Sequence, residues 1–284
     1  MTGVKPKEED FVEHLFVASS HDYLLFFTNK GRVYWKKVHE MPEASRVSRG
    51  KAIINLLDLQ RGEQVATTLA IREFEEDKHV VMATKMGFVK KTDLMLYSHL
   101  RAAGIVALKI REEDELIGVR VTSGDHDIFL ITRHGKSIRF KESDLRSMGR
   151  VAAGNIGIRM EKDDEVVGME SLREGAAILT VTENGFGKRT KTEEYRRQSR
   201  GGKGILTIKT TDRNGPVVYS CQVDDQDQLM IITGQGKIIR LRVADISIIG
   251  RNTQGVKLIG MADGEKVVGV AKVIEEDIKS DELL

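Results

Sequence analysis

The chain has 284 residues, of which 40% are hydrophobic and 31% charged, with 45 basic against 43 acidic residues. This hydrophobic share allows a packed core, and the near-balanced charge argues against an intrinsically disordered chain. A single cysteine excludes an intramolecular disulfide, and no apolar run approaches the roughly 18 residues expected of a membrane span. With no signal peptide recognisable, these features predict a soluble, cytoplasmic protein.

Along the chain, an apolar run that ends in a turn glycine appears five times, with a period of about fifty residues. The first run starts at Tyr23 and reaches its glycine eight residues later. The turn glycines are Gly31, Gly87, Gly135, Gly185 and Gly236. A second short run follows each glycine, which supplies the positive φ of a tight turn, so each pair of runs predicts a β-hairpin, as in Asp127 to Phe140.

Two further features keep the same period. A loop glycine follows each hairpin, and an arginine precedes it by four residues in four copies and by three in one. These loop glycines are Gly50, Gly104, Gly154, Gly204 and Gly255, and the arginines are Arg46, Arg101, Arg150, Arg200 and Arg251. A polar turn such as Asp164-Glu165 then leads into another apolar run. Because three features share one period, the chain is predicted to consist of repeats.

Each repeat offers four short runs with strand character, and no segment shows a sustained helical stripe. The pattern predicts an all-β fold of propeller-like, four-stranded blades. Five complete repeats run from Tyr23 to Ile274, and Thr2 to Val17 resembles the second half of a repeat, Val106 to Val121. Met1 then aligns with Ile105, one residue after a loop glycine. We expect one domain over residues 1–274, a six-bladed disc with an incomplete first blade whose half unit covers residues 1–20.

Outside a short acidic tail, basic residues outnumber acidic ones. Residues 275–284 hold five acidic residues and one lysine, and the remainder carries 44 basic and 38 acidic residues. Bases recur on the strand after each turn glycine, whereas acids collect at the polar turns. Residues two apart on a strand share a face, so the strand bases and the loop arginines are predicted to form a basic band on the perimeter.

A curved basic band suits duplex DNA, because backbone phosphates repeat regularly and can be bound without reading bases. The candidate DNA-binding residues in the loops are Arg46, Arg49, Lys51, Arg101, Arg150, Gln198, Arg200, Gly201, Gly202, Lys203, Gly204 and Arg251. Those on the strands are Lys90, Lys91, Arg139, Lys141, Lys188, Arg189, Arg240 and Arg242. The alternative is that outward strand positions carry charge only for solubility and to prevent edge pairing.

No catalytic, metal or cofactor site is predicted. The seven histidines show no paired ligand spacing, and one cysteine cannot form a thiolate cluster. Lys203 is followed by Gly204, where a phosphate-binding loop requires Ser or Thr, so no nucleotide site is supported. Trp35 and the sparse tyrosines do not make a stacking platform for single strands.

From Thr2 to about Glu275, the sequence resembles the C-terminal domain family of the A protein of bacterial DNA gyrase. The most similar stretches are residues 87–92, 140–149, 184–190 and 246–256. The loop from Gln198 to Gly204 matches the seven-residue signature of that family except at Ser199, where a base is usual. In the family this loop lies in the first blade, whereas the good copy here lies in a late repeat, and the expected first copy would end just before Met1.

The resemblance implies a six-bladed β-pinwheel that bends duplex DNA around its rim and presents it for strand passage by an ATP-dependent type IIA topoisomerase, in support of negative supercoiling. It implies double-stranded DNA, the remainder of the gyrase A protein and the gyrase B protein as partners, and no membrane. Cleavage in the family needs a tyrosine next to an arginine in a separate domain. No tyrosine here follows an arginine, so the isolated chain is not expected to be an enzyme.

Two alternatives remain open. One is the C-terminal domain of topoisomerase IV, which presents DNA without a strong wrap. The other is a propeller-type platform for protein interactions, which would require an apolar or acidic docking face.

Overall fold

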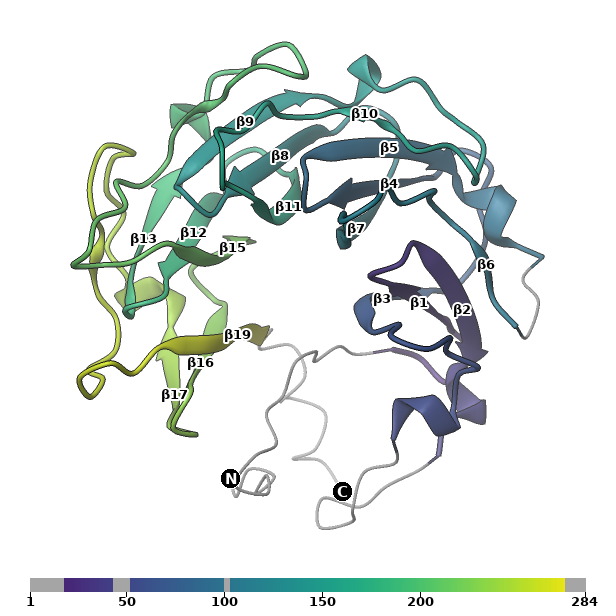
Figure 1. Ribbon diagram of the computed structural model, residues 1–284, viewed down its shortest axis with the longest axis horizontal. Coiled ribbons are helices and arrows are strands. Elements are labelled where there is room, and N and C mark those ends of the chain that lie inside the picture. The colour runs from purple at the N-terminus through teal and green to yellow at the C-terminus, as the bar shows by residue number, and fades with distance from the viewer. Residues whose placement is uncertain (1–17, 43–51, 100–102, 274–284) are drawn as a thin grey trace. The chain divides into compact units, whose positions relative to one another are not determined.

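The computed structural model describes residues 18–42, 52–99 and 103–273, which form strands and short 3-10 helices but no α-helix (Figure 1). The described strands form five sheets, four with four strands and one with three. The all-β prediction is therefore confirmed. The acidic tail and nearly all of the half unit predicted over residues 1–20 lie outside the described residues.

The four-stranded sheets all have the same strand order. The first sheet holds β3 (Val65–Ile71), β1 (Tyr23–Thr28), β2 (Arg32–Lys37) and β6 (Ile105–Val106) in that order. The second holds β7 (Leu116–Thr122), β4 (His79–Thr84), β5 (Phe88–Asp93) and β10 (Asn155–Ile156). The third holds β11 (Val166–Leu172), β8 (Asp127–Thr132), β9 (Lys136–Lys141) and β14 (Ile205–Leu206). The fourth holds β15 (Val217–Val223), β12 (Ala177–Thr182), β13 (Phe186–Lys191) and β18 (Val256–Lys257).

In the fifth sheet, β17 (Ile238–Arg242), β16 (Gln228–Thr233) and β19 (Val267–Val273) are the described strands. Its hairpin and its third strand correspond to those of the other four sheets. No described segment pairs with the outer side of β17, which in the other sheets is occupied by a two-residue strand.

The two-residue edge strand of each four-stranded sheet comes from the following repeat. Arg32 of β2, for example, pairs with Val106 of β6, and β7 then joins the next sheet. The predicted count of four strands is confirmed, but one repeat of the sequence does not coincide with one blade. The short run that follows the loop of Arg150 is a strand only at Asn155–Ile156, which pairs with β5 at the edge of the preceding blade.

A threonine three residues before each turn glycine fixes the hairpins. In the first hairpin the amide of Gly31 donates to the carbonyl of Thr28 (2.9 Å), and the amide of Arg32 donates to the Thr28 hydroxyl (3.2 Å). Gly31 has φ +74°, a conformation that glycine adopts without strain. The predicted hairpin turns are thus confirmed, and the same hydroxyl contact recurs at Thr84 and Thr132, which accept from the amides of Phe88 and Lys136 over 3.2 Å.

The first strand of each hairpin is buried on both faces. All six residues of β8 and all six of β12 are buried. A strand covered on both sides reads as a continuous apolar run rather than an alternating one. Packing between the first two sheets buries Leu25, Phe27, Val80 and Met82, among others.

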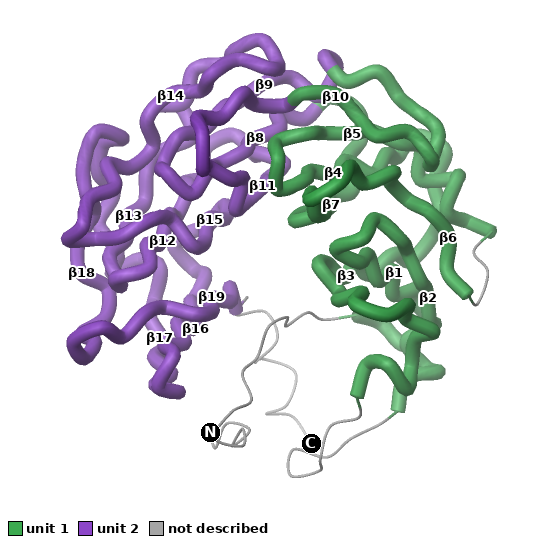
Figure 2. Tube along the Cα trace, viewed as in Figure 1, with its two compact units in different colours: residues 1–10, 16–125, 145–156 green, residues 11–15, 126–144, 157–284 purple. Residues whose placement is uncertain are grey.

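A 3-10 helix follows the second strand of each hairpin. These helices are η1 (Val38–Glu40), η3 (Leu94–Tyr97), η4 (Glu142–Asp144), η5 (Thr192–Glu194) and η6 (Val243–Asp245), with a further one, η2 (Ile53–Asn55), before β3. The described residues fall into two compact units (Figure 2). Unit 1 contains the first two sheets and Leu145–Ile156, and unit 2 contains the other three sheets.

Candidate nucleic-acid interface

Three of the predicted loop arginines lie in the described residues. Arg150, Arg200 and Arg251 are each half-buried and stand a few residues before β10, β14 and β18, the edge strands of their sheets. The loops therefore occupy the same position in successive repeats, as the period predicts. Arg46, Arg49, Lys51 and Arg101 lie outside the described residues.

The loop glycines are needed for close packing and not for flexibility. A Cβ at Gly204, where φ is +71°, would lie 2.5 Å from the carbonyl oxygen of Ser137, and one at Gly154, with φ +79°, would lie 2.6 Å from that of Val89. Gly255 is crowded in the same way, at 2.8 Å from a carbonyl oxygen of β13. A larger residue at any of these positions would push the loop off the sheet.

The expectation that all eight strand bases lie on an exposed band is wrong for Arg139, whose side chain is 12% exposed, and for four buried residues. Lys90 and Lys188 are only 1% and 0% exposed, and Lys91 and Arg189 are also buried. Alternation fails as a guide here because neighbouring chain segments cover both faces of β5 and β13. These four side chains are not at the surface of the described structure, so a DNA contact by them finds no support in it.

The two buried lysines donate to the main chain of the loops. Lys90 Nζ donates to the carbonyl of Ala107 (2.7 Å) and to that of Arg150. Lys188 Nζ donates to the carbonyls of Gly250 and Arg251, both at 2.7 Å. Burial lowers the pKa of Lys90 to about 8, assisted by the charge of Arg150, and burial likewise lowers that of Lys188 to about 8.

Arg139 and Arg189 also point inward. Arg139 donates through Nε to Asp127 (2.7 Å) and through Nη1 to the carbonyl of Thr192 (2.8 Å), and its side chain is 12% exposed. Arg189 Nε donates to the carbonyl of Ile246 (2.7 Å). Both arginines thus fasten a hairpin to the main chain at the 3-10 helix of the following repeat, which makes them structural in this molecule.

The remaining strand candidates are exposed, as predicted. Lys141, Arg240 and Arg242 lie at the surface. Arg242 forms a two-point contact with Asp245, in which Nε and Nη2 each donate over 2.9 Å. This hydrogen-bonded carboxylate raises the pKa of the Arg242 guanidinium.

The glycine-rich loop from Gln198 to Gly204 is held by main-chain contacts. The amide of Gly201 donates to the carbonyl of Gly157 (2.7 Å), and the amide of Arg159 donates to the carbonyl of Gly202 (2.9 Å). Lys203 is exposed, whereas Gln198 and Arg200 are half-buried. The loop therefore presents Lys203 from a fixed backbone.

The residues Arg146 and Arg196 were not singled out from the sequence. Both are exposed, and each directly follows a buried residue, Leu145 or Tyr195, just after a 3-10 helix. Each lies four residues before a loop arginine, Arg150 or Arg200, and this repeated spacing could have identified them from the sequence.

Within the described residues, no group of three or more His, Cys, Asp or Glu side chains is arranged to hold a metal ion. In the same part of the chain, no helix is long and apolar enough to span a membrane.

Comparison with known proteins places this architecture in a family. The family model described as DNA gyrase C-terminal domain, beta-propeller, matches residues 22–72, 78–123, 126–173, 176–219 and 227–274, one match for each sheet. The chain is 54% identical over 281 residues to the DNA gyrase A protein of Halalkalibacterium halodurans, covering 99% of this chain and 33% of that protein. It is 51% identical over 274 residues to the DNA gyrase A protein of Salmonella typhimurium, covering 96% of this chain and 31% of that protein.

Among solved structures, the crystal structure of the C-terminal domain of DNA topoisomerase IV is similar, with a TM-score of 0.83 and 27% identity, covering 90% of this chain and 80% of that one. The chain spans about a third of the length of the curated relatives it matches. Since the family model matches well over half of the residues, this chain belongs to the DNA gyrase C-terminal domain family, with five described blades of the beta-propeller.

Proposed function

We propose that this chain binds duplex DNA along its basic loops, bends it, and presents it for strand passage by gyrase, a type IIA topoisomerase, in support of negative supercoiling. Its partners would be double-stranded DNA, the remainder of the gyrase A protein and the gyrase B protein. The chemistry of DNA cleavage and ATP hydrolysis would then belong to those other parts, and the chain itself would have no enzymatic activity.

One observation carries this proposal. The arginine-bearing loops with Arg150, Arg200 and Arg251 recur at the same position in three successive repeats, a few residues before the edge strand of a sheet. A cation that recurs once per repeat suits a polyanion such as duplex DNA, and binding through phosphates tolerates any base sequence. The relatives named as gyrase A proteins support the same conclusion.

The complete domain is proposed to be a six-bladed β-pinwheel over residues 1–274. Within the described residues, the fifth sheet has three strands, whereas the other four have an additional edge strand from the following repeat. The half unit predicted at the start of the chain is the candidate for pairing with the outer side of β17. This proposal predicts that deleting residues 1–17 lowers the thermal stability of the fifth blade.

The function is tested by removing the loop arginines. Replacing one phosphate-contacting arginine should weaken duplex binding about eightfold at 0.1 M salt, since each contact contributes a slope of about −0.9 in log K against log salt. The triple variant R150A/R200A/R251A should therefore bind a duplex several hundredfold more weakly in a fluorescence anisotropy titration. R173A removes an exposed arginine paired with Asp224 and serves as the matched control. Unchanged binding by the triple variant would refute the proposal.

A second candidate function is suggested by the similarity to the topoisomerase IV domain. A domain of that kind would present DNA without wrapping it strongly. Religation of nicked DNA circles in the presence of the chain separates the two functions. A positive change in linking number indicates gyrase-type wrapping, and no change indicates presentation alone.

A further inference from the structure

The attachment of the basic loops follows a common pattern. Lys188, on β13, lies three residues after its turn glycine, and its amine reaches the carbonyls of Gly250 and Arg251 and the hydroxyl of Thr253 (3.2 Å). Lys90 holds the corresponding place on β5 and reaches the carbonyl of Arg150. In both cases a buried lysine of one hairpin donates hydrogen bonds to the loop of the following repeat.

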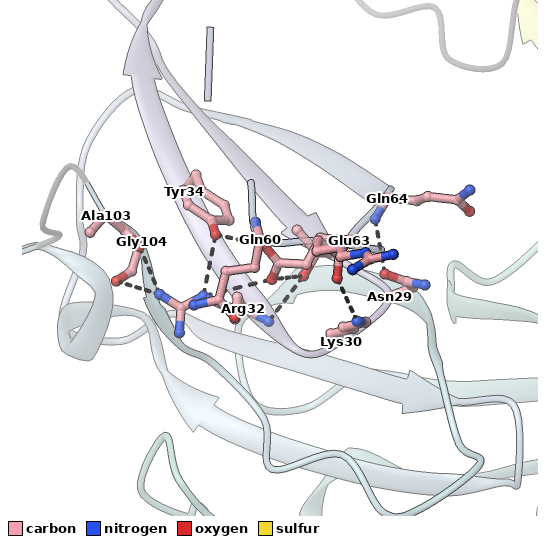
Figure 3. Close-up of polar contacts among 11 residues, drawn as sticks. Asn29, Lys30, Arg32, Tyr34, Gln60, Glu63, Gln64, Ala103 and Gly104 are labelled. Atoms are coloured by element: carbon pink, nitrogen blue, oxygen red, sulfur yellow. Dashed lines mark hydrogen bonds and ion pairs between the residues drawn. The ribbon is translucent and has the colours of Figure 1, made fainter. Parts of the chain in front are cut away.

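In the first sheet an arginine at a different strand position makes the equivalent hydrogen bonds to the loop. Arg32 Nη2 donates to the carbonyls of Ala103 (2.7 Å) and Gly104 (3.2 Å). Figure 3 shows the guanidinium between these carbonyls on one side and Tyr34 and Glu63 on the other. Its Nε lies 3.3 Å from the Tyr34 hydroxyl and 3.6 Å from Glu63 Oε1.

The buried Glu63 carboxylate orients this arginine. It accepts hydrogen bonds from the Tyr34 hydroxyl (2.7 Å), from the Thr28 hydroxyl (3.1 Å) and from the amide of Gln60 (2.6 Å). Burial, followed by the hydrogen bond to Glu63, raises the pKa of Tyr34. A carboxylate with this many donors is held firmly, so the guanidinium that it faces is held as well.

The third sheet has no lysine at the position of Lys90 and Lys188. Ile138 occupies the position of Lys90 and Lys188, three residues after the turn glycine, and it cannot donate. The loop there is the glycine-rich one, in which Gly201 and Gly202 pair through their main chain with residues 157–159. The loops of Arg150 and Arg251 make the matching backbone bond at Ala152 and Thr253, and the glycine-rich loop adds to it the bond from the amide of Gly201 to the carbonyl of Gly157.

We propose that Lys188, Lys90 and Arg32 are positioning residues, which fix the DNA-contacting loops from beneath without touching DNA themselves. The inference rests on the proposed function, because it assigns a role to these residues in DNA binding. A loop fixed before binding loses less conformational entropy on meeting a phosphate, so its arginine contributes more to affinity. The positive charges, which the sequence suggested as contacts, then act through the loop backbone.

A double-mutant cycle in the 284-residue chain tests this role. R251A removes the side chain proposed to meet DNA, which also donates through Nη1 to the carbonyl of Leu206 (2.8 Å), but it leaves the carbonyl that accepts from Lys188. K188M removes the hydrogen bonds to the loop but keeps an unbranched side chain at the same buried position. Each single variant should bind a duplex about eightfold more weakly at 0.1 M salt, with a salt slope less steep by about one. The double variant should also lose about eightfold, because both changes disable one contact. I138M, at the matching position of the third sheet, should bind like the parent chain.

Each result of this cycle either supports or contradicts the positioning role of Lys188. An additive loss of about sixtyfold in the double variant would mean that Lys188 acts independently of Arg251. Parent-like binding by K188M would show that the Lys188 hydrogen bonds do not affect DNA binding, and parent-like binding by R251A would show that this loop does not contact DNA. All three results would overturn the inference while leaving DNA binding intact. Absence of salt-dependent binding by the parent chain would instead contradict the proposed function. If circular dichroism shows K188M unfolded, the same cycle with K90M and R150A decides.

Discussion

Replacing Gly204 with alanine tests the claim that the loop glycines are structural. The new Cβ would lie 2.5 Å from the carbonyl oxygen of Ser137 and 3.2 Å from Cδ1 of Ile158, in a residue with φ +71°. The left-handed conformation costs a residue with a Cβ about 1–2 kcal/mol, and overpacking adds about 1–3 kcal/mol. We therefore expect the free energy of unfolding to fall by about 2–5 kcal/mol.

Gly264 provides the matched control. Its φ is +76°, and no atom lies within 4 Å of the position that a Cβ would occupy. G264A should therefore show the conformational cost of about 1–2 kcal/mol without the clash. Urea denaturation followed by far-UV circular dichroism measures both variants. If G204A proves no less stable than G264A, the close approach of the loop to β9 does not constrain this position.

Three further changes test the account of the surrounding residues by urea denaturation. E113G should stabilise the chain by up to about 1 kcal/mol, because Glu113 has φ +60°, a left-handed conformation that strains a residue with a Cβ. A loss of stability in E113G would contradict this strain at Glu113. Lys188 has a pKa of about 8 when folded, below its ordinary 10.5, so the unfolded chain binds the proton more tightly. Its contribution to stability should rise by about 3 kcal/mol as pH increases from about 8 to 10.5, and K188M should reduce that rise. R139M removes one of two arginines paired with the buried Asp127, of which Arg197 remains, and should cost about 1.5–3 kcal/mol for the lost charged hydrogen bonds. R242M, at an exposed pair, should cost less than about 1 kcal/mol, and equal losses would count against a buried role for Arg139.

The hairpins could be predicted from the sequence because their signals are local. Each turn glycine and the threonine three residues before it act within one hairpin, as at Thr28 and Gly31. The exchange of edge strands could not be predicted in this way. Nothing in the two residues Ile105–Val106 indicates that they pair with β2, some seventy residues earlier, because the pairing depends on how the repeats pack.

The candidate site was predicted in part for the same reason. The period located the loops of Arg150, Arg200 and Arg251, but the outward direction assigned to Lys90 and Lys188 was wrong. Alternation distinguishes two faces of a strand and implies that one meets solvent, whereas hairpin strands in a blade are covered on both. A lysine in such a place is satisfied by carbonyls of an arriving loop, which are distant in sequence.

The salt dependence of duplex binding tests the central claim most directly. If the chain follows DNA with its basic loops and neutralises about eight phosphates, a plot of log K against log salt should be linear with a slope near −7. The affinity should change little between duplexes of different sequence. Binding that stays constant between low and moderate salt, or no binding at ordinary salt, would contradict the account.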